Sequence, residues 1–138
     1  MDQITCGAGE NQIILGNGNT TVSLANGSDA VTAGSGKDTF AFTSRLHVDQ
    51  IHGFNPHLDH IMLSKATFAR IVGDHGVLAS ADFVIGSHAL TRAEHIIYNA
   101  HNGFLYYDRD GSGPAHKVHF ATLDPHLHLT AHDFLVSA

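Results

Sequence analysis

Apolar residues alternate with polar ones in a pattern that repeats every nine residues over the first 42 positions. The repeat ends in an x-apolar-x-apolar stretch, as at Val22/Leu24 and Phe40/Phe42. Alternation with a period of two indicates short strands with one buried face. A fixed short period indicates one small unit stacked on itself, so that each unit buries the apolar face of its neighbour. The pattern therefore predicts a stack of short strands in the N-terminal part of the chain.

Glycine occupies alternate positions before these strands, and an Asp or Asn stands between the glycines and most of the strands. Glycine permits a backbone turn with positive φ, where a Cβ atom would clash. An Asp beside the turn adds a carboxylate to the carbonyl oxygens of the turn, and oxygen ligands of this kind suit Ca²⁺. The sequence therefore predicts calcium sites at the turns. The candidate residues are Gly7, Gly9, Asn11, Gly16, Gly18, Gly27, Asp29, Gly34, Gly36 and Asp38.

The repeated segment resembles the haemolysin-type, or RTX, calcium-binding nonapeptide repeat G-G-x-G-x-D-x-U-x of proteins exported by type I secretion. The resemblance implies a parallel β-roll in which two repeats form one coil, so that residues 18 apart in the sequence are neighbours. Asn11 is then expected beside Asp29, and Thr20 between Asp2 and Asp38. Because Asn11 and Thr20 stand where the family has Asp, the resemblance implies weak or partly vacant calcium sites. A metal-free β-solenoid is the alternative.

The segment that follows the repeats, residues 38–64, is similar to the stretch that caps the roll in serralysin-type C-terminal domains. Within it, residues 59–63 (Asp-His-Ile-Met-Leu) reproduce the Asp-x-apolar-x-apolar tail of one more repeat, although His57 stands where the repeat has glycine. We expect the turn there to differ. Asp59 either completes a calcium site with the last loop or is a solvated turn residue.

A second phrase, Tyr-Tyr-Asp-Arg-Asp-Gly-Ser-Gly over residues 106–113, also resembles a recurring phrase of RTX C-terminal domains. Its Asp108 and Asp110 can offer two carboxylates to one Ca²⁺ ion, as the opening of an EF-hand loop does, but the later ligands of such a loop are missing. Asp and Gly also form turns without a metal. The two interpretations are a further calcium-binding loop and a hairpin turn.

The C-terminal half has the pattern of further strands. Residues 94–99 and 103–107 form a hairpin signal around Asn102-Gly103, and residues 117–123 read as a third strand. The similar phrases at 80–86 and 129–136 each predict a turn that leads into a short strand or helical turn, and residues 64–71 predict a short helix or a loop. We therefore expect one all-β domain, residues 1–138, with little helix. In this domain a short parallel β-roll (residues 1–63) is followed by an antiparallel β cap (residues 64–138).

Composition limits the partners of this domain. The chain has 13 acidic and 7 basic residues and a net charge of −6, which argues against nucleic acid and anionic lipid. The sequence has no apolar run that predicts membrane insertion and no N-terminal signal pattern. The resemblance instead implies a C-terminal secretion signal within residues 129–138, a type I exporter as partner and an extracellular location. The single cysteine, Cys6, falls in an apolar column and is expected to be buried.

The 13 histidines all lie after residue 46. Their spacings suit a transition metal, because neutral imidazole binds Zn²⁺, Cu²⁺ and Ni²⁺. A solvated His-rich surface that gains charge on acidification is the alternative, and capture of haem by one histidine is another. The candidate transition-metal ligands are His57, His60, His116, His119, His126, His128 and His132.

No catalytic motif is found, since the sequence lacks both His-Glu-x-x-His and Gly-x-Ser-x-Gly. We therefore expect a protein that is not an enzyme. The resemblance implies a calcium-binding module of a secreted bacterial protein that folds when it meets Ca²⁺ outside the cell. Two alternatives remain: a secreted His-rich protein that binds a transition metal or haem on a β-roll scaffold, and an extracellular module that self-associates through exposed strand edges.

Overall fold

The computed structural model describes residues 2–5, 9–24, 27–43, 48–74 and 76–137. Within these residues the chain forms fourteen strands and two short 3-10 turns, so the predicted all-β class is confirmed. The predictions for Cys6 and Gly7 lie outside the described residues. The strands are β1 (Asp2–Thr5), β2 (Gln12–Ile14), β3 (Thr20–Leu24), β4 (Ala30–Thr32), β5 (Asp38–Phe42), β6 (Asp49–His52), β7 (His60–Ser64), β8 (Gly73–Asp74), β9 (Val77–Leu78), β10 (Phe83–Ile85), β11 (Ile96–Asn99), β12 (Phe104–Tyr107), β13 (Val118–Thr122) and β14 (Phe134–Ser137), and the 3-10 turns are η1 (Ser80–Asp82) and η2 (Ala131–Asp133).

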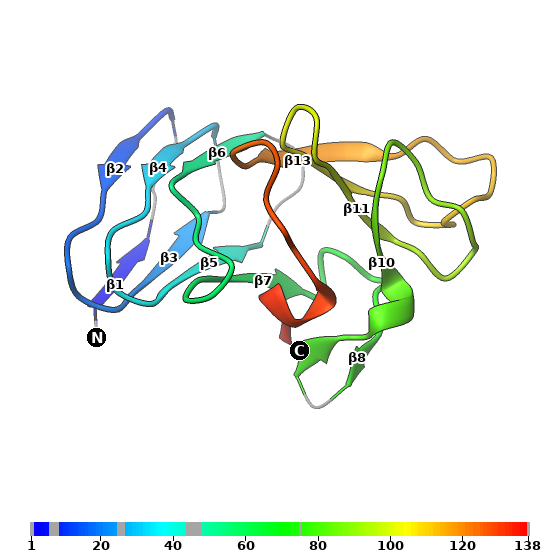
Figure 1. Cartoon of the computed structure of the whole chain (residues 1–138), viewed down its shortest axis with the longest axis horizontal. Helices are drawn as coiled ribbons and strands as arrows, with labels where there is room; N and C mark the ends of the chain where they lie inside the picture. Colours follow the sequence, from blue (N-terminus) through cyan, green and yellow to red (C-terminus); the bar gives the residue numbers. More distant parts are fainter. Residues whose placement is uncertain (1, 6–8, 25–26, 44–47, 75, 138) are drawn as a thin grey trace.

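The strands form two sheets, whose N-terminal parts lie one above the other in Figure 1. One sheet has the order β1-β3-β5-β7-β14-β9-β8, and the other has the order β10-β11-β12-β13-β6-β4-β2. Successive strands from β1 to β7 therefore alternate between the two sheets, and each of β1 to β5 pairs in parallel with the strand two positions later. The N-terminal part is thus a coil of two parallel sheets, and the stack of short strands predicted from the alternation is present.

The register of the first coils follows the repeat length. Thr20 pairs with Asp2 on one side and with Asp38 on the other, a step of 18 residues that equals two nine-residue repeats. The following coil is longer, because Asp38 has its next neighbour at Asp59, 21 residues later. The extra residues lie outside the strands, so the alternation of buried and half-buried side chains is preserved in β7.

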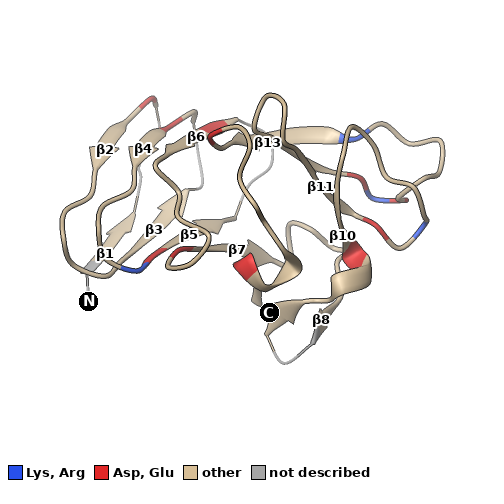
Figure 2. Cartoon of the chain, in the orientation of Figure 1, with Lys and Arg blue, Asp and Glu red and all other residues tan. Residues whose placement is uncertain are grey.

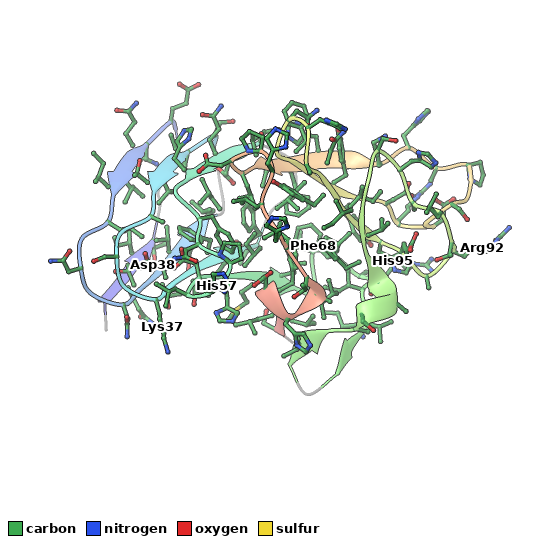
Figure 3. All side chains as sticks on the ribbon, in the orientation of Figure 1. Lys37, Asp38, His57, Phe68, Arg92 and His95 are labelled. Atoms are coloured by element: carbon green, nitrogen blue, oxygen red, sulfur yellow. The ribbon has the colours of Figure 1, made fainter. Side chains whose placement is uncertain are left out.

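One apolar core continues from the coil into the C-terminal half. The alternating residues of the repeats, such as Val22 and Phe40, are completely buried between the sheets. Beyond them Phe68 packs against Tyr107 and Phe120, with ring centroids 5.2 Å and 4.9 Å apart. Figure 3 shows Phe68 near the middle of the molecule. The two halves therefore share a core.

The C-terminal half extends both sheets of the coil. Strands β11, β12 and β13 form the predicted antiparallel meander. The meander has parallel neighbours on both sides, because β10 pairs with β11 and β6 pairs with β13. In the other sheet β14 is parallel to β7. The cap is therefore mixed in direction, because two of its strands continue the parallel sheets of the coil.

The connecting segments follow the sequence pattern in part. The two similar phrases, 80–86 and 129–136, each contain a 3-10 turn (η1 or η2) that leads directly into a strand, as predicted. Residues 65–71 form turns, the loop alternative of the prediction, and their apolar members Phe68 and Ile71 are buried.

Candidate functional site

Two ladders of polar residues run along the coil, one on each side, at the positions where turns lead into strands. Each member lies two residues before a core-facing apolar residue of its strand, and the acidic members are at most 3% exposed. Acidic positions are visible at the starts of β4, β5 and β6 in Figure 2. The first ladder consists of Asn11, Asp29 and Asp49, and the second ladder consists of Thr20, Asp38 and Asp59.

In the second ladder each carboxylate connects two coils through backbone hydrogen bonds. Asp38 accepts the N–H of Thr20 at 3.2 Å with Oδ1 and the N–H of Gly34 at 3.1 Å with Oδ2. Asp59 accepts the N–H of Asp38 at 2.9 Å with Oδ1 and the N–H of Asn55 at 2.9 Å with Oδ2. Both oxygens of each carboxylate therefore have donors. The buried aspartates supply the acceptors that backbone N–H groups in the turns do not find in a neighbouring strand.

The electrostatic environment of Asp59 opposes its ionisation. Burial raises the pKa of the Asp59 carboxyl, and the negative charge of Asp38 raises it further, whereas the backbone hydrogen bonds from Asn55 and Asp38 lower it. Asp59 is completely buried, so the solvated turn residue that the sequence allowed is not found. The stacked carboxylates repel each other, and a cation near the ladder would relieve this repulsion.

The first ladder has an unsatisfied oxygen. Asp29 accepts the backbone N–H of Asn11 at 3.0 Å and its Nδ2 amide at 2.9 Å, both with Oδ1, and its own N–H donates to Asp49 at 2.8 Å. Its other oxygen, Oδ2, is buried and has no hydrogen-bond donor among the described residues. A buried carboxylate oxygen without a partner is costly, because it has lost its hydration without compensation.

A cavity lies at this position. Its volume is about 630 Å³, and it is open to solvent. Asp29 is the buried acid in its lining, and Glu10 adds a second carboxylate at the rim. The other lining residues are Asn11, Gln12, Ser28, Ala30, Val48 and Gln50.

The ligands available at this cavity are mainly oxygens. Among the described residues no group of three or more His, Cys, Asp or Glu side chains is arranged to hold a metal. A cation at Asp29 would therefore need amide, backbone carbonyl or water oxygens to complete its shell, and Ca²⁺ accepts such ligands.

The glycines of the turns are required for two different reasons. Gly9 and Gly27 have φ values of +93° and +80°, in the left-handed region that the repeat predicted. Gly34 and Gly36 do not lie in this region, but a Cβ atom at either position would overlap the backbone of the turn one coil earlier. Glycine is required there because the turns stack closely, a requirement that the prediction from φ alone did not include. The turns of neighbouring coils are thus in backbone contact.

The Asp108–Gly113 loop connects β12 to β13 and brings its two carboxylates together. Asp110 Oδ2 accepts the N–H of Ala115 at 3.0 Å, and its Oδ1 is buried without a partner in the described residues. Burial raises the pKa of Asp108, and the hydrogen bond from Ala115 lowers the pKa of Asp110. The loop is the connection of the β12–β13 hairpin, as one of the two interpretations predicted, and calcium binding by Asp108 and Asp110 stays a prediction.

The candidate histidines are dispersed. His60, together with His57 and His132, lies close enough to Asp133 for its charge to act on that carboxyl, whose pKa is raised mainly by burial. The remaining exposed candidates do not join this group; they are His116, His126 and His128.

His119 is different because it belongs to an aromatic cluster. Its ring stacks on Phe104 with centroids 3.9 Å apart, and its Nε2 is 3.0 Å from Thr122 Oγ1. Burial lowers the pKa of His119 below 6.5. The unfolded chain therefore binds more protons than the folded protein just below pH 6.5, and stability is lost as the pH falls through this value.

Replacing His119 with Phe should remove this acid sensitivity, because Phe stacks in the same way and does not titrate. The free energy of unfolding in urea, measured at pH 7.5 and 5.5 at one calcium concentration, should fall less on acidification for His119→Phe than for the wild type. An equal fall in both proteins would contradict the role assigned to His119.

Several buried acids were not among the predicted site residues. Asp49 extends the first ladder, and its Asp-x-apolar pattern was visible in the sequence. Asp82 accepts the N–H groups of Val72 and His95, and its Oδ1 is 2.7 Å from His95 Nδ1. Asp133 forms a capping box with Thr130. Asp82 and Asp133 thus stabilise the 3-10 turns η1 and η2, which lie in the two similar phrases at 80–86 and 129–136.

No protein-family model matches the chain, and no curated protein is significantly similar to it in sequence. None of the helical segments that the structure describes has the length and apolar character needed to span a membrane.

Proposed function

We propose that this protein is a calcium-binding module of the RTX type, which folds when Ca²⁺ binds between its stacked turns. The observation that carries the proposal is the buried Asp29 Oδ2, a carboxyl oxygen that has no hydrogen-bond donor among the described residues, in a side chain that lines an open cavity. A divalent cation would supply the missing positive partner and would use the neighbouring amide and carbonyl oxygens as further ligands. The 18-residue register, which brings Asn11 to Asp29, provides additional support.

The mechanism is linkage between binding and folding. The ladders exist only when successive coils are stacked, so the unfolded chain has no comparable site for the ion. An ion that binds the folded state alone stabilises it, by about 1.4 kcal/mol for one site at ten times its Kd. A Kd on the order of 10⁻⁴ to 10⁻³ M is expected for an extracellular module with reduced ligand charge. Such a protein remains open where calcium is scarce and folds where it is abundant.

The cellular setting is proposed from the sequence resemblance. A module that stays unfolded at low calcium suits export as an extended chain, and the type I exporter is the partner that the repeat implies. On this proposal the protein acts outside the cell. Its role is structural and regulatory, because calcium determines whether the coil is formed.

Isothermal titration with Ca²⁺ tests the proposal. The wild type should bind Ca²⁺ in preference to Mg²⁺, which is smaller and loses its water reluctantly. Asp29→Asn keeps the size of the side chain and an acceptor for the Asn11 N–H but removes the charge, so calcium affinity should fall by about tenfold or more.

The matched control is Asp124→Asn, since Asp124 is 42% exposed and accepts a backbone N–H from Gly53 away from both ladders. This variant should retain the affinity of the wild type. Equal calcium affinity in Asp29→Asn and the wild type would remove Asp29 from the site and with it the main support for the proposal.

A further inference from the structure

A second cavity lies in the C-terminal half, away from the ladders. Its volume is about 430 Å³, and three of the five described residues that line it are arginines, in a chain with only 7 basic residues. The arginines come from three separate connections, between β7 and β8, between β10 and β11, and between β12 and β13. Figure 2 shows Lys or Arg positions in the loops beyond β11, at the end opposite the N-terminal coils. The lining residues are Arg70, Arg92, His95, Arg109 and Asp110.

Hydrogen bonds hold these three connections together. The backbone N–H of Arg70 donates to the Tyr107 hydroxyl at 3.1 Å, which fixes the first connection to β12. The N–H of Ser112 donates to the carbonyl of Thr91 at 3.0 Å, which joins the second and third connections. Backbone hydrogen bonds therefore hold the three arginines close to one another. Their side chains are exposed to solvent.

The charges in this cavity are unbalanced. The ion pairs among the described residues are His52–Asp124 and His95–Asp82. None of the three arginines therefore has a carboxylate oxygen of a described residue within 4.0 Å. Asp82 is the partner of the His95 ring, with Oδ1 2.7 Å from Nδ1. Asp110 contributes one negative charge, but its Oδ2 already accepts the Ala115 N–H. The arginines thus remain in excess over the single acid of the lining.

We propose that this arginine cavity binds a small molecule through a phosphate or sulfate ester group. Guanidinium groups donate in a planar fork that matches two oxygens of such an anion, and charge-assisted hydrogen bonds of this kind are stronger than neutral ones. The volume lies in the range of small-ligand sites. The net charge of −6 repels anions from most of the surface, so a local excess of arginine gives selectivity for this place.

Calorimetric titration with four related sugars tests the proposal on the full chain. The probes are glucose-6-phosphate, glucose-6-sulfate, glucuronate and uncharged glucose, so the sugar is constant and the anion varies. Binding of either ester, with glucose and glucuronate much weaker, is the expected result, and the two esters distinguish phosphate from sulfate. No preference of the esters over glucose, or a preference for glucuronate, would overturn the proposal.

Variants locate the binding in the cavity. Arg92→Gln and Arg109→Gln should each weaken ester binding about tenfold or more, and folding should not suffer because both side chains are exposed. Lys37→Gln removes an exposed charge at the opposite end of the molecule from Arg92 (Figure 3) and should change the affinity less than about twofold. An equal loss in Lys37→Gln and Arg92→Gln would show that general charge attraction, and not this cavity, binds the ester.

Asp110→Asn separates this inference from the proposed calcium function. Removing the carboxylate from the lining should tighten ester binding, because the anion no longer meets a negative charge. The same substitution should weaken any calcium binding by the Asp108–Gly113 loop. Weaker ester binding in Asp110→Asn would count against the arginine cavity as an anion site.

Discussion

Substituting Gly34 with alanine is expected to destabilise the coil severely, whereas the same substitution at Gly16 should be nearly neutral. A Cβ atom at Gly34 would overlap the backbone oxygen of Gly16 in the turn beneath it, and backbone cannot move aside as a flexible side chain can. A Cβ atom at Gly16 meets none of the described residues within 4 Å. Overpacking of this kind costs about 3 kcal/mol, which is a large part of the stability of a small domain.

Urea unfolding at saturating calcium measures this difference. The free energy of unfolding should fall by about 3 kcal/mol in Gly34→Ala and by less than about 1 kcal/mol in Gly16→Ala. The two glycines occupy the same place in successive coils, so their intrinsic backbone preferences are closely matched. Equal effects in the two variants would contradict close stacking of the turns as the reason for glycine at position 34.

Replacing Asp59 with alanine is expected to produce the second large effect. The buried backbone N–H of Asp38 and the part-buried N–H of Asn55 would lose their acceptors, and an unsatisfied buried donor costs about 1–3 kcal/mol. We therefore expect a loss of about 2–5 kcal/mol in the free energy of unfolding. Asp124→Ala removes one hydrogen bond, from the Gly53 N–H, and a solvent-exposed contact with His52, and should cost about 1 kcal/mol or less.

Chemical denaturation in EDTA and again in calcium distinguishes a structural from a metal-binding role for Asp59. Because both of its oxygens already accept backbone hydrogen bonds, the loss in Asp59→Ala should be similar in the two conditions. A loss seen only in the presence of calcium would contradict this assignment and make Asp59 a calcium ligand.

The sequence predicted the coil well because its period is a direct consequence of stacking. The resemblance to the RTX repeat implied two repeats in each coil and thereby Asn11 beside Asp29, and the structure has this contact. The alternation of Val22 and Leu24 with polar residues likewise placed them in the core. Local regularity of this kind is readable in a single chain, because each unit has the same environment as the next.

Features that depend on long-range contacts were not predicted. The arginines at 70, 92 and 109 are far apart in the sequence, and only the folded loops bring them to one cavity. The role of Asp38 as a backbone acceptor between coils was also missed, because the repeat identified it as a calcium ligand. The Asp29 oxygen without a hydrogen-bond donor among the described residues distinguishes the two ladders, and the polar-x-apolar pattern that both ladders share gives no sign of this difference.

Far-UV circular dichroism of the EDTA-treated protein, titrated with Ca²⁺ at neutral pH, measures directly whether folding depends on calcium. We expect a spectrum of largely unfolded chain without calcium, and a cooperative change to β-structure with a submillimolar to millimolar midpoint, on the order of the Kd of extracellular calcium modules. Asp29→Asn should shift this midpoint to higher calcium. A fully formed β spectrum in EDTA that calcium leaves unchanged would contradict calcium-dependent folding.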